Sequence, residues 1–174
     1  MSALSTTLEW PSWSAIVFSA APASKLGRGA VPQVVQPDRR QARLVTGYQQ
    51  LVVERSIPFR SLCEHHFLPF TGHAYVAYLP GERILGLSKL ARVVEMFAHR
   101  PQVQERLTQQ VADWLDQHLR PQGTGVVLVA EHLCMTLRGA RAAGSTTVTS
   151  ALHGVLLDDH RAREEFFALA AISS

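Results

Sequence analysis

The sequence concentrates cysteine and histidine in two short clusters. In the first, Cys-Glu-His-His at residues 63–66, Cys63 and His66 have a Cys-x2-His spacing that can close around one metal ion. The second, His-Leu-Cys at residues 132–134, supplies another thiolate and another imidazole. Zinc prefers nitrogen and sulfur ligands, and a catalytic zinc keeps three protein ligands and one open position for water. Two thiolates and one histidine from these clusters would make such a set.

Each cluster also has an ordinary structural explanation. A buried cysteine usually behaves as a small hydrophobe, and single histidines are often core residues with satisfied polar atoms. Two clusters that each follow a predicted strand favour a shared metal site over that explanation. The His-x-Glu and Pro-Cys-x-x-Cys signature of the zinc deaminases that act on bases is absent from the sequence.

Basic residues form a second candidate group. Lys89 and Arg92 lie three residues apart, on one face near the start of a predicted helix. Cations beside the free N–H groups of a helix start suit a phosphate ligand. A solvated basic edge is the simpler explanation of this pair alone. Arg138, which precedes a glycine, adds a third candidate phosphate contact.

An acidic residue is the third candidate. Glu105 falls in the first turns of a predicted helix. A carboxylate there can accept two hydrogen bonds from guanine, from N1–H and from the 2-amino group, and adenine does not offer that donor pair. The alternative is a first-turn acid that the helix dipole favours, which is the simpler explanation from spacing alone.

The elements that must position these residues follow from the hydrophobic pattern. Ser88 is a plausible N-cap for one helix, and Pro101 suits the first turn of the next. Alternating and apolar runs predict strands, and a spacing of three to four predicts helices. The expected order begins with two strands at 51–59 and 72–80. One helix that starts at 88 and a second at 101–119 follow them. Strands at 125–130 and 146–152 and a terminal helix at 160–171 complete the order. This order predicts an α+β domain with antiparallel hairpins.

Composition limits the class of protein. The chain has 174 residues, 47% of them hydrophobic and 18% charged, which is typical of a globular domain. No apolar run is long enough to span a membrane, and a net charge of +3 gives no argument for nucleic acid, so we expect neither as a partner. Two cysteines fit a reduced protein, and residues 13–24 lack the basic start of a signal peptide. We therefore expect a cytoplasmic location.

The chain divides into two parts of unlike composition. Residues 1–45 are rich in Ala, Ser, Pro and Arg and show no sustained period, so we expect a largely irregular segment with at most a short helix near 12–20. The periodic sequence begins after it, which places the domain that carries the candidate site residues at 46–174.

Together these motifs resemble the GTP cyclohydrolase I family. The matching stretches are SLCEHHFLPFTGHAYVAYLP, GLSKLARVVEMFAHRPQVQERLTQQVADWL, AEHLCMTLRGAR and STTVTSALHG, followed by Arg-Glu-Glu-Phe near the end. They occur in colinear order over residues 48–167. Members of the family usually begin with a helical region that carries a Thr-Pro-x-Arg-Val type motif, which residues 1–45 do not show.

The resemblance implies a fold, a reaction and an assembly. The fold would be the tunnelling fold, a ββααββ antiparallel sheet with two helices packed on one face, whose subunits form a toroidal decamer. The reaction would be hydrolytic opening of the imidazole ring of GTP, which yields formate and 7,8-dihydroneopterin triphosphate for folate and other pterins. A zinc ion, Zn²⁺, would be the cofactor, and GTP the substrate.

The resemblance also assigns roles, residue by residue. Zinc would be held by Cys63, His66 and Cys134. The acid–base histidines would be His65 and His132, and Ser88 would act after ring opening. Guanine would be recognised by Gln104 and Glu105, and the triphosphate by Lys89, Arg92 and Arg138.

Two other functions stay open at this point. One is a catalytically impaired tunnelling-fold homologue that binds purine or pterin nucleotides and whose altered N-terminal segment prevents assembly. The other is the same activity used in a secondary-metabolite pathway. Native mass would distinguish the first from an active enzyme, because the family's active sites lie between subunits.

Overall fold

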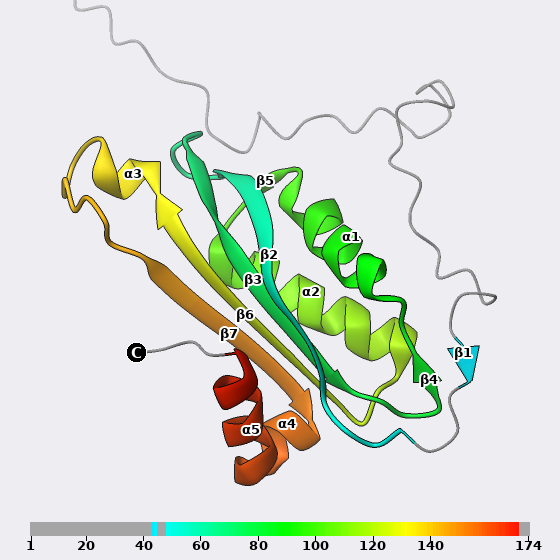
Figure 1. The fold of residues 1–174 in the computed structure, drawn as a ribbon. Coiled ribbons are helices and arrows are strands. Elements are labelled where there is room, and N and C mark those ends of the chain that lie inside the picture. The colour runs from blue at the N-terminus through cyan, green and yellow to red at the C-terminus, as the bar shows by residue number, and fades with distance from the viewer. Residues whose placement is uncertain (1–42, 45–47, 171–174) are drawn as a thin grey trace, which may run out of the picture. The chain divides into compact units, whose positions relative to one another are not determined.

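The computed structural model describes residues 43–44 and 48–170 (Figure 1). Its main feature is a five-stranded sheet with the strand order β5-β2-β3-β6-β7. Strands β2 and β3 run antiparallel, as do β3 and β6, and β6 and β7. The bounds are β2 (Val52–Cys63), β3 (Pro69–Leu79), β5 (Pro101–Gln102), β6 (Gly123–His132) and β7 (Thr147–Gly154). With two helices between β3 and β6, this is the predicted ββααββ order.

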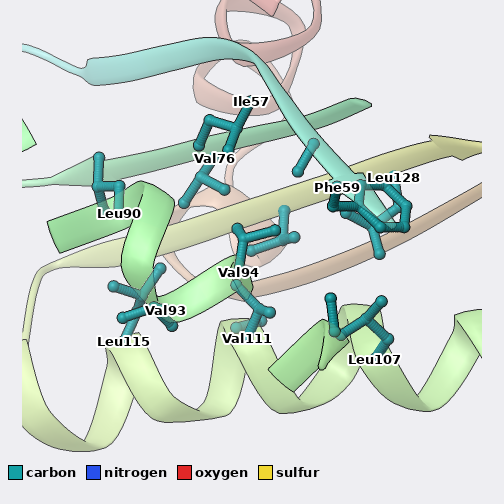
Figure 2. Packing of buried hydrophobic residues seen from close by; sticks show 14 of the residues in the cluster. Ile57, Phe59, Val76, Leu90, Val93, Val94, Leu107, Val111, Leu115 and Leu128 are labelled. Carbon is teal, nitrogen blue, oxygen red and sulfur yellow. The ribbon is translucent and has the colours of Figure 1, made fainter. Parts of the chain in front are cut away.

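Two long helices cover one face of the sheet. They are α1 (Leu87–Ala98) and α2 (Gln104–Leu119), and each turns an apolar stripe toward the strands. Figure 2 shows the resulting core, in which side chains of β2, β3 and β6 meet those of the two helices. The labelled residues are Ile57, Phe59, Val76, Leu90, Val93, Val94, Leu107, Val111, Leu115 and Leu128. Burial of this apolar surface fixes which strand faces point toward the helices.

Two further helices pack against the opposite face at one end of the sheet. They are α4 (Val155–Asp158) and α5 (His160–Ala170), and they lie beside the Gly154 end of β7 (Figure 1). Phe166 of α5 is fully buried there with Leu156 and Val127. A Cβ at Gly125 would come within 2.9 Å of the Phe166 ring, so this glycine makes room for the helix. The rest of that face is not covered by these helices.

Several details differ from the sequence prediction. The predicted N-cap at Ser88 is wrong, because α1 begins at Leu87 and Gly86 holds the cap position without a side-chain hydrogen bond. The predicted helix start at Pro101 is also wrong, because Pro101 pairs with Leu62 in the short parallel strand β5. The short elements α3 (Leu133–Thr136), α4, β1 (Arg43–Leu44) and β4 (Arg83–Ile84) were not predicted. Of these, β1 and β4 form by pairing with each other, which local spacing does not show.

The predicted N-terminal segment lies almost wholly outside the described residues. Only residues 43–44 of it are described, as strand β1 paired with β4, and the predicted helix near 12–20 falls outside. The boundary after residue 45 therefore stays a prediction. Within residues 43–44 and 48–170, no helix is both long and apolar enough to cross a membrane.

Candidate metal centre and active site

The two Cys/His clusters lie at the same end of the sheet. Strand β2 ends at Cys63 and strand β6 ends at His132. Strand β3 runs between them, and Phe70 on it stands opposite His132 and Ser61. Because neighbouring strands lie about 4.8 Å apart, the two strand ends bring residues far apart in sequence to one place.

Three ligand atoms meet at this end. The side-chain ligand atoms of Cys63, His66 and Cys134 all lie within 4.8 Å of one another. Cys63 is buried, Cys134 is half-buried and His66 is exposed. Two sulfurs and one imidazole nitrogen are ligands that suit zinc, and an exposed ligand leaves one side of the group open.

A tight turn places His66 beside Cys63. The Phe67 N–H donates to the Cys63 carbonyl at 2.8 Å, and the Cys63 N–H donates to the Leu68 carbonyl at 2.8 Å. Phe67 itself has a φ of 51°, in the left-handed region, which lets the chain reverse into β3. As a result the Nδ1 of His66 lies 3.6 Å from the Sγ of Cys63.

The short helix α3 supplies the third candidate ligand, Cys134. It begins directly after His132, so Cys134 turns back toward the end of β2. Burial, and after it the neighbouring Cys63 sulfur, raise the pKa of the Cys134 thiol, while the positive charge of Arg138 acts in the opposite direction. A divalent cation at this position would favour the ionised form of the Cys134 sulfur.

The His132 ring is held in a defined place. It stacks on the buried ring of Phe70, with centroids 4.5 Å apart and planes 6° apart. Its Nε2 lies 2.7 Å from the Oε1 of Gln104. Partial burial lowers the pKa of His132, and the negative charge of Glu105 opposes that shift. Burial therefore favours the neutral form of the ring, and a carboxylate lies near it.

Other predicted residues gather near the group. Glu105 and Arg138 are close enough for their charges to act on His132 and on Cys134, respectively. The His65 ring lies edge-on to that of His66, with centroids 6.1 Å apart. These residues and the three ligands form one cluster at this end of the sheet.

Ser88, Lys89 and Arg92 do not join this cluster. They lie in the first turns of α1, which follows β4 at the Leu79 end of β3, whereas the metal ligands lie at the Pro69 end (Figure 1). An 11-residue strand such as β3 spans about 35 Å. One subunit therefore does not bring all the predicted substrate contacts together.

A cleft lined by three neighbouring strands and α1 is a separate feature. It has a volume of about 1040 Å³ and is lined by residues of β2, α1, β3 and β6, among them Arg60, Glu95 and His99. None of the residues predicted for the site lines it. The candidate metal ligands thus lie outside this cleft.

Sequence reasoning missed the contacts that support the turn at residues 63–67. The Arg106 guanidinium donates to the Glu64 carboxylate, and this hydrogen bond lowers the pKa of Glu64. Arg106 Nε also donates to the buried Gln102 side chain at 3.1 Å, and the Gln102 carbonyl accepts from the Glu64 N–H at 3.0 Å. Phe70, which stacks on His132, was missed as well. Apart from Arg106 and Gln102, which are four residues apart, these partners are distant in sequence, and no local spacing connects them.

Comparison with known proteins decides the family. A family model described as GTP cyclohydrolase I matches residues 28–171. The chain belongs to the GTP cyclohydrolase I family. It is an enzyme of that family, and its candidate metal-ligand group and His132 come from the motifs that carry the resemblance in sequence.

Curated relatives agree with this assignment. GTP cyclohydrolase 1 of Aquifex aeolicus (strain VF5) is 57% identical over 123 residues, which cover 71% of this chain and 67% of that protein. GTP cyclohydrolase 1 of Synechococcus sp. (strain JA-2-3B'a(2-13)) is 54% identical, over 71% of this chain and 54% of that protein. The match thus spans about two thirds of one relative and about half of the other.

A solved structure supports the fold. The apo form of the archaeosine synthase QueF-Like aligns with a TM-score of 0.50 and 14% identity, over 63% of this chain and 97% of that one. With the ββααββ order, this agrees with the tunnelling fold expected of the GTP cyclohydrolase I family. At this identity the likeness concerns the fold alone.

Proposed function

We propose that this protein opens the imidazole ring of GTP by zinc-dependent hydrolysis, which yields formate and 7,8-dihydroneopterin triphosphate. The observation that carries the proposal is the Cys63, His66 and Cys134 group beside His132, in a chain of the GTP cyclohydrolase I family. The product would enter folate or pterin biosynthesis. Its use in a secondary-metabolite pathway is an alternative that involves the same chemistry.

The residues present fit a zinc ion. Cys63, His66 and Cys134 would hold it, because they offer two sulfurs and one nitrogen within 4.8 Å of one another. When bound, zinc supplies Lewis acidity, which makes water at the site a source of hydroxide near neutral pH. That chemistry is what hydrolysis at C8 of guanine requires. Both cysteines are free thiols, and we therefore place the enzyme in a reducing compartment, the cytoplasm.

The chain's own residues would bind the base and move protons. Glu105 would accept hydrogen bonds from N1–H and the 2-amino group of guanine, which selects GTP over ATP. His132 would give a proton to N7 of guanine as the C8–N bond breaks, because a histidine gains and loses protons near the working pH. His65 would serve as a second proton carrier, and Ser88 would act after ring opening.

The triphosphate would be bound by residues of two subunits. Arg138 lies near the metal ligands, whereas Lys89 and Arg92 lie at the start of α1, toward the other end of the sheet. A second copy that offers its α1 start would complete the set of cations. We therefore propose that the enzyme works as a homo-oligomer, with a decamer as the assembly expected from the family.

Turnover of GTP is the direct test. The full chain, loaded with zinc, should convert GTP to a product that oxidises to fluorescent neopterin, and ATP should give none. A chain that binds GTP, does not assemble, and releases no formate would instead be the impaired, nucleotide-binding homologue.

A further inference from the structure

The side chain of Gln104 is buried inside the protein, with 2% of its surface exposed. Its Nε2 donates to the carbonyls of Leu128 and Thr147, at 3.1 and 3.0 Å, and lies 3.1 Å from the Thr149 hydroxyl. Carbonyl oxygens only accept hydrogen bonds, so the NH₂ group of the amide must face them. The amide therefore has one orientation, with Oε1 toward His132.

This orientation determines which nitrogen of His132 carries a hydrogen. Gln104 Oε1 is an acceptor, and His132 Nε2 lies 2.7 Å from it, so Nε2 must be the donor. A neutral imidazole carries its hydrogen on one nitrogen only. Nδ1 is then the nitrogen that is free to take up a proton and hand it on.

The His132 ring plane is restricted as well. Phe70, which is fully buried, stacks on the ring with planes 6° apart. Gln104 reaches the ring from α2, and Phe70 reaches it from β3. The amide selects the tautomer and the phenyl ring restricts the tilt, so both act on His132 rather than on the substrate.

We propose that Gln104 is a positioning residue, which holds His132 in the Nε2–H tautomer for proton transfer through Nδ1. This rests on the proposed function, because it assigns the proton transfer to His132. It differs from the role that the resemblance implies for Gln104, contact with guanine. The NH₂ group of the buried amide faces two carbonyls and its oxygen faces His132, so both ends already make hydrogen bonds within the protein.

A mutant cycle distinguishes the roles that Gln104 could have. The zinc-loaded full chain, Gln104→Met, His132→Ala and the double variant are compared for kcat and KM with GTP. Gln104→Met keeps the side-chain length but cannot accept from Nε2–H. We expect its kcat to fall roughly ten- to a hundredfold with KM changed less than about threefold. In the His132→Ala background, the same substitution should lower kcat no further.

Several outcomes would overturn the proposal. A higher KM with unchanged kcat would make Gln104 a guanine contact. Losses that multiply in the double variant would make it a structural tie between α2 and β7. A wild-type chain that turns over no GTP would overturn the proposed function and this proposal together, whereas an active wild type with multiplying losses overturns the positioning role alone.

Two further variants serve as a substitute for Gln104→Met and as a control. If Gln104→Met does not fold, the same cycle is run with Gln104→Glu, which keeps an oxygen facing His132. Its kcat loss should be smaller than a hundredfold and should again vanish in the His132→Ala background; a loss that persists there contradicts the proposal. Gln109→Met is the matched control, because Gln109 lies on the same helix and bonds to Asp113 on its exposed side. Its kcat should match wild type.

Discussion

The Nδ1 of His66 lies 3.6 Å from the Sγ of Cys63, across a single tight turn at the end of β2. This pair is local, and the turn that closes at Phe67 is enough to form it. The third member of the group, Cys134, follows in sequence only after strands β3 to β6 and helices α1 and α2. The turn therefore brings Cys63 and His66 together by itself, whereas Cys134 joins them only when β6 has paired with β3.

Loss of Cys134 should leave a site too weak to hold zinc. Cys134→Ala removes one of two sulfur ligands, and a cysteine with one histidine is a poor set for this ion. We expect the purified variant to contain far less than one zinc per chain and to lose activity. Metal analysis of the folded protein is the measurement. Met135→Ala removes a neighbouring sulfur outside the group and should retain its zinc. Stoichiometric zinc with full activity in Cys134→Ala would remove Cys134 from the ligand set.

Replacement of Glu105 should weaken the binding of GTP. Glu105→Gln replaces a carboxylate that accepts two hydrogen bonds with an amide that has one acceptor oxygen. A lost charge-assisted hydrogen bond costs about 1.5–3 kcal/mol, which corresponds to roughly ten- to a hundredfold in affinity. Titration of zinc-loaded protein with GTP measures it. Glu164→Gln, an exposed acid on α5, is the control. Unchanged GTP affinity in Glu105→Gln would make Glu105 only a helix-start acid.

Arg138 should affect binding more than chemistry. Arginine stays charged at every working pH and does not shuttle protons. Arg138→Ala should raise KM for GTP by about tenfold and leave kcat within a few fold of wild type. The loss of affinity in Arg138→Ala, relative to wild type, should be smaller for guanosine than for GTP, because guanosine has no phosphate for Arg138 to contact. An equal defect for both ligands would contradict a phosphate contact.

Subunit mixing tests whether the site is shared. Lys89→Ala removes a cation at the start of α1, and His132→Ala removes the proposed proton donor at the other end of the sheet. If one site draws these residues from two copies, random mixing of the two inactive variants should restore about one site in four. Activity measured after co-refolding is compared with each variant refolded alone. No gain on mixing would indicate that each site lies within one subunit.

Stability at high pH should depend on Tyr78. Its hydroxyl accepts from the Leu85 N–H at 2.9 Å, next to the start of α1. Burial raises the pKa of Tyr78, so the folded state keeps its proton where the unfolded chain ionises. The unfolded state then binds fewer protons above about pH 10, and stability falls as pH rises. In Tyr78→Phe, the free energy of unfolding should no longer show this fall with pH. It should also be about 1–2 kcal/mol lower at neutral pH, because the Leu85 N–H loses its acceptor.

Chemical unfolding at pH 7 and above pH 10 measures both effects. Tyr75→Phe, on the opposite face of β3, is the matched control. An alkaline slope that is the same in wild type and Tyr78→Phe would show that another group causes it.

Much of the fold was visible in the sequence because its elements are periodic. The stripe of Val111 and Leu115 in α2, and the alternation in β7, depend on a core face that repeats along the chain. Ser88 and Pro101 misled the prediction because cap preference is a local signal. The pairing of Pro101 with Leu62 depends on a strand 39 residues earlier, which no local pattern shows.

The candidate site was predictable by residue type but not by arrangement. Cysteine and histidine that cluster in sequence indicate metal chemistry, so Cys63, His66 and Cys134 could be predicted from spacing and family resemblance. The stacking of Phe70 on His132, and the turn of the Gln104 amide toward that ring, arise only when three separate elements pack together. The sequence offers no marker for such contacts, since Phe and Gln have many other uses.

The most direct measurement of the central claim is the ratio of formate to pterin released from GTP by one preparation of the full chain. The protein is stripped of metal with a chelator, and half is reloaded with zinc. We predict equal molar amounts of formate and neopterin-type product from the zinc-loaded half, and neither product from the metal-free half. Release of neither product by folded, zinc-loaded protein, or undiminished release without metal, would contradict the account.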